Sequence, residues 1–374
     1  MAAINPAKLT QALAQALDGA APLVLAADLA PRALPQQACL VLGTSGSTAG
    51  KPQIVAISRS AIQAAVSATH EALGGAGSWL LTLPADHVAG VMVAARAHLA
   101  QMPLTRTTPG PFRPETFAAD VERFLADGAA RHYTSLVPTQ LSRVLADPSA
   151  AGAASRLDAI LVGGSATPSG MLRQAREAGL RVVTTYGMTE TCGGCVYDGM
   201  PLAGIDVTLA PDSGRLTIAG PQVALGYLVE GELQPFDGTF VTADRGEWIG
   251  ERLRVLGRLD DVILSGGINV DPRLVEEAIA SLGPVAHCLV VGLPDVEWGN
   301  RVAALVVPHG EVADAARSGL AELVQQTVRE RLGAAWMPRQ VLLTGELPLR
   351  GPGKPDRVAA VHLLGAAPSP PQRD

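Results

Sequence analysis

The sequence has few lysines, few aromatic residues and few cysteines. Only three of its 374 residues are lysine, namely Lys8, Lys51 and Lys354, and the other basic side chains are arginines. Aromatic residues make up 3% of the chain, so a core must be built mainly from alanine, valine and leucine. No run of about 18 apolar residues is present, so no membrane-spanning helix is expected. Residues 1–19 lack the cationic start and apolar centre of a signal peptide and instead predict a short amphipathic helix.

The charge balance is acidic, with a formal net charge of -6 and a pI near 5.7. Nucleic-acid-binding proteins are normally basic, so this class is not favoured, whereas a small anionic substrate needs only local positive charge. Four cysteines in a chain of this length favour a reducing compartment, and we expect a cytoplasmic protein. Cys192 and Cys195 form a Cys-x-x-Cys pair, but no second pair accompanies it, so a zinc or redox role is only an alternative.

Strand-like and helical segments alternate along the first half of the chain. This alternation predicts an α/β fold with a largely parallel sheet up to about residue 190. The expected strands are Ala38–Leu42, Ser78–Leu83, Ala159–Val162 and Arg181–Thr185, and the expected helices are Arg59–Leu73, Pro114–Asp127 and Pro168–Ala178. From residue 205 to residue 256, short strands separated by Gly, Asp and Pro turns, such as Asp206–Leu209, Arg215–Ala219 and Arg252–Val255, predict a small β-rich subdomain.

A different block begins at Arg258. Its expected elements are the helices Pro272–Ser281 and Ala313–Leu332 and the strands Ala286–Val291, Val302–Val307 and Arg339–Leu343, which together make a compact α+β unit of domain size. We therefore expect a large N-terminal domain over residues 1–257 and a small C-terminal domain over residues 258–365. Residues 366–374 are polar and rich in proline, and a disordered tail is expected there.

Two of the three lysines, Lys51 and Lys354, lie in the same tripeptide, Gly-Lys-Pro, each within a stretch rich in glycine and proline. In a chain that otherwise uses arginine, this favours a need for a compact point charge, which the planar guanidinium does not replace. Chance is the alternative explanation.

The stretch around Lys51 directly follows the expected strand Ala38–Leu42 and contains glycines, hydroxyl residues and one cation. Glycines let backbone N–H groups turn toward an anion, so the stretch predicts a loop that binds polyphosphate, with a Ser/Gly-rich turn as the alternative. It is not a Walker A loop, because Ser45 stands where that motif needs glycine and Pro52 stands where it needs Ser or Thr.

Three more segments follow this loop in order. They are Thr184-Thr185-Tyr186-Gly187-Met188-Thr189-Glu190, Gly257-Arg258-Leu259-Asp260-Asp261-Val262-Ile263 and Leu349-Arg350-Gly351-Pro352-Gly353-Lys354-Pro355. With the loop, they resemble the acyl-adenylate-forming superfamily of acyl-CoA ligases, luciferases and nonribosomal peptide adenylation domains. The resemblance extends over nearly the whole chain. It implies the fold of that superfamily, with a large N-terminal α/β domain that binds AMP and a small, mobile C-terminal α+β domain that bears a catalytic lysine.

A narrower resemblance is to the o-succinylbenzoate–CoA ligases of menaquinone biosynthesis. The segments concerned are Leu83-Pro84-Ala85-Asp86-His87-Val88-Ala89-Gly90, Ser135-Leu136-Val137-Pro138-Thr139-Gln140-Leu141 and Glu190–Gly199. The chain starts soon after the point where longer members have an N-terminal subdomain, so the resemblance is to the short actinobacterial form. It implies an AMP-forming acid–thiol ligase with ATP, Mg²⁺ and CoA as cofactor and substrates. Small molecules would be its partners, with no nucleic acid and no membrane, and a homodimer is a further expectation.

The resemblance assigns most nucleotide contacts to residues of the motifs. The phosphate loop would hold the β- and γ-phosphates through Thr44, Ser45, Gly46, Ser47, Thr48 and Lys51. The adenine slot would be formed by Gly164, Ser165, Ala166, Tyr186 and Gly187, with the base stacked on Tyr186. Thr189 would contact the α-phosphate and Glu190 would hold Mg²⁺, whereas Asp244 would bind the ribose with help from Arg258.

The remaining assignments concern the acid, the hinge and the thiol. Lys354 would bridge the attacking carboxylate and the ribose–phosphate, and the small domain would turn about Asp260 before CoA enters along Gly266 and Gly267. The acid would be contacted by His87, Gly193 and Gly194, and its second carboxylate by Arg96.

Simpler interpretations remain for several of these residues. Glu190 can be a solvated loop acid, Asp244 can form a surface pair with Arg245, and His87 can be a packed core residue. One departure from the family also stands out. The family usually ends the phosphate loop with Pro-Lys, whereas here Gln53 follows Pro52 and the loop is one residue longer at Ala49. Lys51 can replace the missing charge, or the loop holds pyrophosphate less tightly.

Two other functions remain open. One is a ligase of the same superfamily for another aryl or acyl acid, and the loop around Gly193 and Gly194 is the feature that would discriminate. The other is a non-catalytic nucleotide-binding module. Lys354 within a complete C-terminal domain disfavours that module, while Gln53 gives it slight support.

Overall fold

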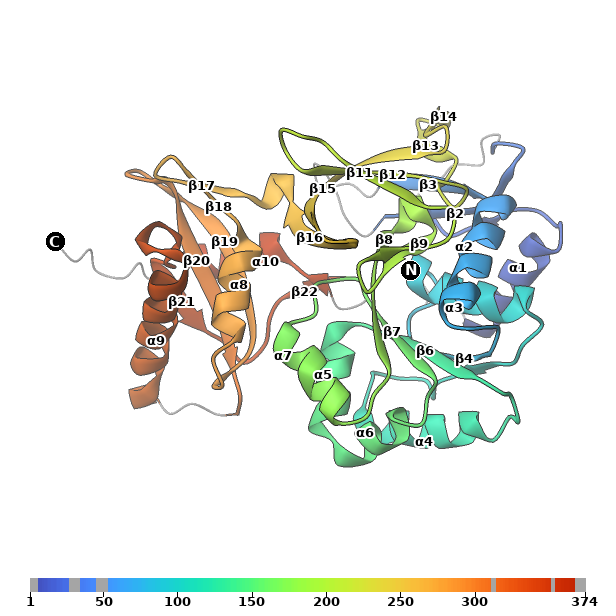
Figure 1. Ribbon diagram of the computed structural model, residues 1–374, viewed down its shortest axis with the longest axis horizontal. Coiled ribbons are helices and arrows are strands. Elements are labelled where there is room, and N and C mark those ends of the chain that lie inside the picture. Colours follow the sequence, from blue (N-terminus) through green and yellow to red (C-terminus); the bar gives the residue numbers. More distant parts are fainter. Residues whose placement is uncertain (1–5, 27–33, 45–52, 311–313, 351–353, 367–374) are drawn as a thin grey trace. The chain divides into compact units, whose positions relative to one another are not determined.

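The computed structural model describes residues 6–26, 34–44, 53–310, 314–350 and 354–366 (Figure 1). Within these ranges the chain divides into two compact units. The first comprises residues up to 242 together with 247–254, and the second comprises 243–246 together with the residues from 255 onward. The division therefore passes through two strands, β15 (Thr239–Ile249) and β16 (Arg252–Arg258). The boundary expected at Arg258 stays a prediction, because a division by packing does not show where the backbone rotates.

A seven-stranded sheet forms the centre of the first unit, with the strand order β10-β9-β8-β7-β6-β4-β5. Its five parallel strands are β4 (Ser78–Leu81), β5 (Leu104–Arg106), β6 (His132–Leu136), β7 (Ala159–Val162) and β8 (Val182–Met188). At one edge, β9 (Gly193–Tyr197) and β10 (Met200–Pro201) continue the sheet in antiparallel fashion. The expected parallel α/β sheet is thus confirmed here.

Helices cover both faces of this sheet (Figure 1). On one face lie α4 (Pro114–Leu125), α5 (Pro138–Ala146), α6 (Pro148–Ala154) and α7 (Ser169–Glu177), and on the other lie α1 (Pro6–Leu17), α2 (Arg59–Ala72) and α3 (Val88–Leu99). Side chains alternate along the strands, so Leu80 and Ile160 pack toward the first set of helices while Trp79 and Leu161 pack toward the second. Burial of both faces explains why β4 and β7 are almost continuously apolar, whereas β6 and β8 also contain threonine.

A second sheet of the first unit has the order β1-β2-β3-β13-β14 and is mostly antiparallel. Its strands are β1 (Leu23–Val24), β2 (Ala38–Gly43), β3 (Ile54–Ser58), β13 (Gly226–Val229) and β14 (Glu232–Pro235). The sequence pattern did not predict this sheet. The strand after the phosphate loop returns beside β2 instead of leading straight into a helix. The helix α2 begins only after β3, where the Ser58 hydroxyl caps it by accepting from the Ala61 N–H at 3.1 Å.

The expected β-rich subdomain corresponds to a four-stranded sheet. Its order is β11-β12-β15-β16, in which β11 spans Asp206–Leu209 and β12 spans Arg215–Ala219. These two strands agree with the sequence prediction, and they pair antiparallel from Asp206 opposite Ala219 to Leu209 opposite Leu216.

The second unit is built on another sheet, with the order β18-β17-β20-β19 and with β21 beside β20. The strands are β17 (Ile263–Ser265), β18 (Ile268–Val270), β19 (Val285–Asp295), β20 (Gly299–Pro308) and β21 (Gln340–Leu343). The helices α8 (Pro272–Ala280) and α9 (Asp314–Leu332) pack on one face, and α10 (Arg357–Ala366) packs on the other. The sequence predicted this α+β arrangement but not α10. A short hairpin, β22 (Leu349–Arg350) with β23 (Lys354–Pro355), precedes α10.

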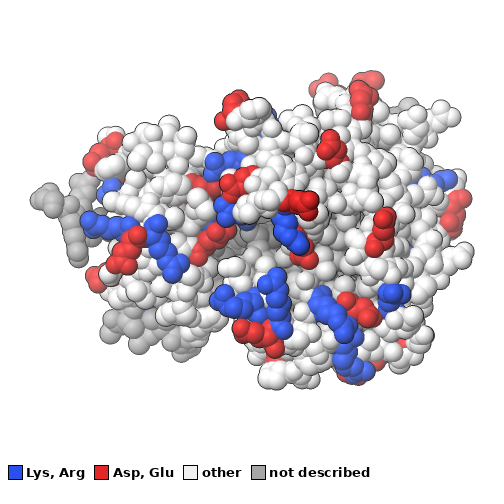
Figure 2. All heavy atoms as spheres, viewed as in Figure 1, with Lys and Arg blue, Asp and Glu red and all other residues white. Residues whose placement is uncertain are grey.

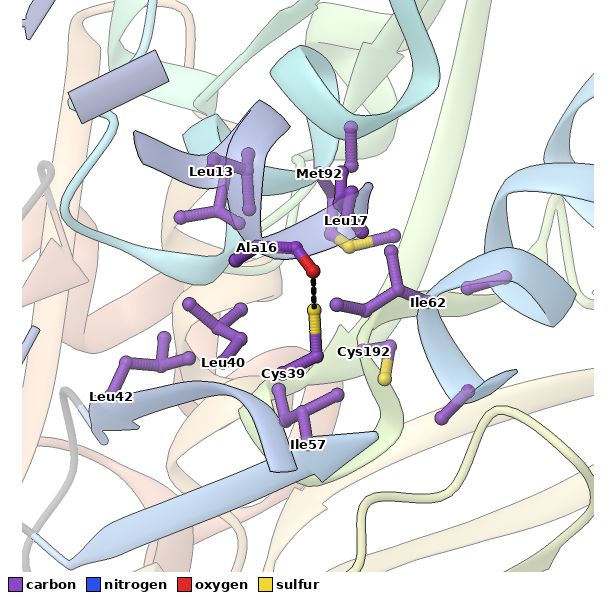
Figure 3. Close-up of a cluster of buried hydrophobic side chains, with 14 of the residues drawn as sticks. Leu13, Ala16, Leu17, Cys39, Leu40, Leu42, Ile57, Ile62, Met92 and Cys192 are labelled. Atoms are coloured by element: carbon purple, nitrogen blue, oxygen red, sulfur yellow. Dashed lines mark hydrogen bonds between the residues drawn. The ribbon is translucent and has the colours of Figure 1, made fainter. Parts of the chain in front are cut away.

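The cysteines behave as small apolar residues. Cys39 lies among leucine and isoleucine side chains near Cys192, and its thiol donates to the Ala16 carbonyl oxygen at 3.4 Å (Figure 3). Burial raises the pKa of Cys195 to about 12 and raises that of Cys192 further, so neither is a thiolate at neutral pH. Within the described ranges, no group of three or more His, Cys, Asp or Glu side chains is arranged to hold a metal ion. The structure therefore gives no support to the zinc or redox alternative.

The surface charge is mixed, and the apolar character of the described helices is limited. On the face drawn in Figure 2, basic and acidic side chains lie among many uncharged ones, and neither sign of charge covers the face. Of the helices that the structure describes, none combines the length and the apolar character needed to cross a membrane.

Candidate functional site

The phosphate loop is described only at its two ends. Ser45, Gly46, Ser47, Thr48 and Lys51 lie outside the described residues, so their predicted role stays a prediction. The Thr44 N–H donates to the Gln53 carbonyl oxygen at 2.7 Å, and the Gln53 N–H donates to the Thr44 hydroxyl at 3.1 Å. The ends of the loop are thus joined by two hydrogen bonds. Gln53, which marks the departure from the family pattern, has a structural role through its backbone.

The adenine-slot residues lie at the carboxyl ends of neighbouring parallel strands. Gly164, Ser165 and Ala166 follow β7, whose Val162 lies opposite Thr184 of β8, two residues before Tyr186. Ligands of open α/β sheets bind in this position, beyond the carboxyl ends of the strands. Tyr186 is half-buried, whereas Gly164 is exposed and has a φ of 85°, a conformation that favours glycine. The structure therefore places these predicted residues at one edge of one sheet.

Gly187 is required by the close approach of β8 and β9. It lies opposite Gly194, and a Cβ at position 187 would be 1.9 Å from the Gly193 carbonyl oxygen. No side chain fits there, because real Cβ atoms do not come so near to backbone oxygen. The glycines of the Tyr186-Gly187 and Gly193-Gly194 motifs thus have a packing role in addition to any contact with a substrate.

A single turn of 3-10 helix, Thr189–Thr191, joins β8 to β9 and presents the two predicted phosphate and metal residues. Thr191 stabilises the turn, since its hydroxyl accepts from the Met188 N–H at 3.0 Å and donates to the Gly193 carbonyl oxygen at 2.8 Å. Gln222, which is buried, adds a donor from a distant segment to the Thr191 carbonyl oxygen at 3.1 Å. Thr189 and Glu190 are therefore placed by a well-bonded backbone.

Glu190 is not a solvated loop acid. The residue is only 8% exposed, and its Oε1 accepts from the Tyr227 hydroxyl at 2.7 Å. Its carbonyl oxygen also accepts from the Ala224 N–H at 2.9 Å. Tyr227 lies on β13 of the second sheet, and its ring meets those of Phe236 and Phe240 edge-on. The carboxylate is thus oriented by a tyrosine that the sequence analysis missed, because nothing in the motif around Glu190 points to residue 227.

The donor set at Glu190 suits Mg²⁺. This ion is usually bound by one or two carboxylates together with substrate phosphates, not by a cage of protein ligands alone. Glu190 offers one oriented carboxylate, and the described residues around it do not form such a cage. The predicted role of Glu190 is therefore chemically consistent with its position.

His87 stands at the N-terminal end of α3. Its side chain is partly exposed and its Nε2 atom lies 3.9 Å from Asp86 Oδ1, so it is not packed in the core. Gly90, in the same motif, is needed for packing, because a Cβ there would be 2.1 Å from the Pro84 carbonyl oxygen. On the same helix Met92 lies next to Gly193. The helix α3 thus lies beside the Gly193–Gly194 segment, and the substrate contacts of His87, Gly193 and Gly194 stay predictions.

Arg96 is buried, with 4% of its surface exposed, and one of its Nη atoms donates to the Tyr197 hydroxyl at 3.3 Å. Its guanidinium also lies over the Trp79 ring, 5.1 Å from the centroid. A Cβ at position 194 would be 2.8 Å from the Tyr197 ring. Arg96 therefore contacts the tyrosine that packs against the predicted substrate segment. Its proposed contact with the second carboxylate stays a prediction.

The residues predicted to bind the ribose and to form the hinge all belong to the second unit. Arg258 donates to Asp260 through Nε at 2.9 Å and through Nη2 at 2.7 Å. The hydrogen bonds to Asp260 raise the pKa of Arg258, and the charges of Asp260, Asp244 and Asp261 raise it further, whereas burial acts to lower it. Arg245 forms its ion pair with Asp271 at 2.5 Å. The alternative in which Asp244 pairs with Arg245 is thus not favoured, and Asp244 instead faces the charge of Arg258.

The CoA-path and lysine residues are also in this unit. Gly266 and Gly267 form the exposed turn between β17 and β18, with φ values of 56° and 78°. A Cβ on Gly266 would be 2.5 Å from the Trp298 ring, so this glycine also has a packing role. Lys354 begins β23, and its backbone pairs with that of Arg350. Its side chain is outside what the structure describes.

Comparison with known proteins agrees with this geometry. A family model described as AMP-binding enzyme matches residues 5–228, and one described as AMP-binding enzyme C-terminal domain matches residues 274–354. A probable 2-succinylbenzoate–CoA ligase from Mycobacterium tuberculosis is 40% identical over 329 residues, which cover 86% of this chain and 84% of that protein. An indoleacetate–CoA ligase from Aromatoleum aromaticum is 30% identical over 353 residues, which cover 87% and 67% of the two chains.

A solved structure extends the comparison to the fold. The o-succinylbenzoate CoA synthetase from Bacillus subtilis, in complex with the acyl-adenylate intermediate OSB-AMP, is similar with a TM-score of 0.69 and 26% identity. The match covers 85% of this chain and 68% of that one. The resemblance to the acyl-adenylate-forming superfamily is thereby confirmed. This chain belongs to the family of AMP-binding enzymes, and both the N-terminal and the C-terminal domain of that family are present in it.

Proposed function

We propose that the chain is an ATP-dependent o-succinylbenzoate–CoA ligase of menaquinone biosynthesis. It activates the acid as an acyl-adenylate and transfers the acyl group to CoA, with release of AMP and pyrophosphate. The observation on which this proposal depends is the 40% identity to the 2-succinylbenzoate–CoA ligase over 86% of the chain. The positions of Tyr186, Thr189 and Glu190 at the carboxyl end of β8 add support, because an adenylate-forming site requires a nucleotide there.

In the first half-reaction two anions must meet, namely the acid carboxylate and ATP. Attack of the carboxylate on the α-phosphate forms the acyl-adenylate and expels pyrophosphate. We propose that Thr189 donates to the α-phosphate and that Lys354 bridges the attacking carboxylate and the ribose–phosphate. Glu190 would hold Mg²⁺, which would neutralise phosphate charge. A preorganised charge of this kind is typically worth ~10²–10³ in rate.

In the second half-reaction the CoA thiol attacks the acyl carbon and AMP leaves. A lysine over the phosphate would obstruct the thiol, so we propose that the small domain turns about Asp260 between the two steps. The exposed turn at Gly266 and Gly267 would then border the path of the pantetheine arm. Asp244 and Arg258, which are electrostatic neighbours, would hold the ribose hydroxyls.

A second candidate is a ligase of the same family for another aryl acid. The similarity to indoleacetate–CoA ligase over 87% of the chain favours this alternative specifically. The segment Gly193–Gly194, supported by Arg96 and Tyr197, is the part of the site that would decide between acids. A non-catalytic nucleotide-binding module is not favoured, because both catalytic domains of the family are present.

Product analysis with a panel of acids tests the proposal. With o-succinylbenzoate, ATP and CoA we expect AMP and pyrophosphate, and we expect ATP–pyrophosphate exchange to depend on the acid. Formation of ADP and phosphate would contradict the adenylation chemistry. Higher kcat/KM with indoleacetate than with o-succinylbenzoate would replace the proposed substrate by the second candidate. Sedimentation of the same sample would test the predicted homodimer.

We also propose a cytoplasmic location, because the described cysteines are all free thiols.

A further inference from the structure

One arginine of the second unit joins three separate segments of the chain. Arg357 is the first residue of α10, and its Nε atom lies 3.2 Å from Asp261 Oδ2. Its Nη1 atom donates to Glu276 Oε1 at 3.0 Å and also to the Val290 carbonyl oxygen. A single guanidinium therefore binds the segment after Asp260, the helix α8 and the strand β19.

The inner part of this network is closely packed. Glu276 Oε1 also accepts from the Val290 N–H at 2.9 Å, and the Glu276 carbonyl oxygen accepts from the Cys288 thiol at 3.4 Å. Burial raises the pKa of Glu276, although the charge of Arg357 opposes this effect. Burial acts to lower the pKa of Arg357, but the charges of Glu276 and Asp261 raise it. Each charge is thus held by the other, as a buried pair requires.

The outer part of the network lies next to the predicted hinge. Asp261 is the last residue of the 3-10 turn Leu259–Asp261, directly after Asp260, and its side chain is 33% exposed. If the backbone rotates at Asp260, Asp261 is the first residue on the side of the small domain. The bond to Arg357 therefore connects the moving side of the hinge to the start of α10.

The same arginine lies close in sequence to the proposed catalytic lysine. Lys354 and Arg357 are three residues apart, a stretch of chain that spans at most about 10 Å. The hairpin that contains Lys354 is closed by pairing of Leu349 with Pro355, and the Asp356 N–H donates to the Pro348 carbonyl oxygen at 2.8 Å. Little free chain remains between the lysine and the guanidinium, so displacement of one displaces the other.

We propose that Arg357 is a positioning residue for adenylation, which fixes the Lys354 hairpin to the hinge side of the small domain through Asp261. The inference rests on the proposed function, in which Lys354 acts only in the first half-reaction. It adds that the bond between Asp261 and Arg357 holds the lysine hairpin in place relative to the hinge. A loose hairpin would still permit the second half-reaction, because the thiol step does not use Lys354.

The test uses Asp261→Asn, which removes the outer charge and leaves the buried Arg357–Glu276 pair intact. We expect adenylation to fall by ~10-fold to ~10²-fold, the range that follows from misplacing a reacting group by about 1 Å. Transfer from preformed acyl-adenylate to CoA should stay within about two-fold. Arg357→Lys should give the same imbalance, because an ammonium cannot span both acids. Asp158→Asn is the control, since it weakens an Asp–Arg pair of the first unit whose aspartate is 39% exposed, close to the 33% of Asp261.

A double-mutant cycle separates positioning from general stability. In a Lys354→Ala background, Asp261→Asn should cause no further loss of adenylation, whereas independent effects would multiply. Hydrogen exchange of residues 348–356 supplies a second readout that does not depend on activity. We expect faster exchange there in Asp261→Asn than in the wild type and no change in Asp158→Asn.

The outcomes are distinguishable from failure of the proposed function. If the wild-type protein adenylates a different acid, only the proposed substrate changes, and the double-mutant cycle is run with that acid. Equal losses in both half-reactions, multiplicative losses in the cycle, or unchanged exchange in the hairpin would each overturn the positioning role. A wild-type protein that adenylates no acid would remove the proposed function and the positioning role together.

Discussion

Tyr227→Phe is the most informative single change in the first unit. The hydroxyl of Tyr227 donates to Glu190 Oε1 at 2.7 Å, and Glu190 is the proposed Mg²⁺ ligand. The substitution removes one oxygen atom and keeps the ring, whose edge-on contacts with Phe236 at 4.8 Å and Phe240 at 6.3 Å are preserved. The carboxylate keeps its charge but loses the group that fixes its orientation. We therefore expect a partial loss of adenylation.

The magnitude follows from the type of hydrogen bond. A hydrogen bond to a charged group contributes about 1.5–3 kcal/mol, and each 1.4 kcal/mol corresponds to about tenfold in an equilibrium or rate. Because the bond is present both before and during the reaction, only part of its free energy appears in the rate. We expect kcat/KM for adenylation to fall by ~10-fold and the Mg²⁺ concentration at half-maximal rate to rise. Glu190→Gln, which removes the charge itself, should cost ~10²–10³ in rate or more.

The assay is ATP–pyrophosphate exchange as a function of Mg²⁺ concentration, with thermal unfolding of each variant as a check on the fold. Tyr133→Phe is the matched control, because its buried hydroxyl donates to the Leu73 and Gly75 carbonyl oxygens at 3.1 Å, away from the site. The control should lose stability without any change in the Mg²⁺ dependence. Normal exchange in Tyr227→Phe at low Mg²⁺ would refute the view that this tyrosine orients the metal-binding carboxylate.

Three other outcomes are expected. Lys354→Ala and Lys354→Arg should both impair adenylation and spare CoA transfer from synthetic acyl-adenylate, because a guanidinium is too broad for one bridging position; equal losses in both assays would contradict this. Burial, followed by the charge of Arg96, lowers the pKa of His70 from 6.5 to about 4, so the unfolded chain binds more protons between these values. The free energy of unfolding, measured in urea, should therefore fall by roughly 2 kcal/mol as the pH drops through this window. His70→Leu should remove that slope, and a slope that persists in this variant would contradict its assignment to His70. Gly187→Ala should cost ~1–3 kcal/mol of stability through its clash with Gly193, and an unchanged unfolding midpoint would show that β8 and β9 can separate.

Local patterns in the sequence predicted much of the fold. The helix expected at Arg59–Leu73 is observed at Arg59–Ala72, and the strand expected at Ala159–Val162 has those bounds. Such elements are determined by side chains close together in sequence, such as the Ser58 cap of α2. The strand expected at Arg181–Thr185 is observed as β8 (Val182–Met188), with Tyr186, Thr189 and Glu190 at its carboxyl end, and the roles of these residues stay predictions.

Pairings between distant segments were not predictable in this way. The sheet that holds Tyr227 forms because β13 pairs with β3, with Tyr227 opposite Val55, and no local pattern specifies that choice. The tyrosine that contacts Glu190 was missed for this reason. Arg357 is similar, because its partner Glu276 is 81 residues away and each residue alone looks like an ordinary surface charge.

The hydrogen bonds between Thr44 and Gln53 join the two strands on either side of the predicted phosphate loop. Because the two strands on either side are joined at its base, their register does not depend on what lies between them. Lengthening a closed loop from seven to eight residues costs only about 0.1 kcal/mol in closure entropy. The insertion predicted at Ala49 therefore needs no change in the pairing of β2 with β3.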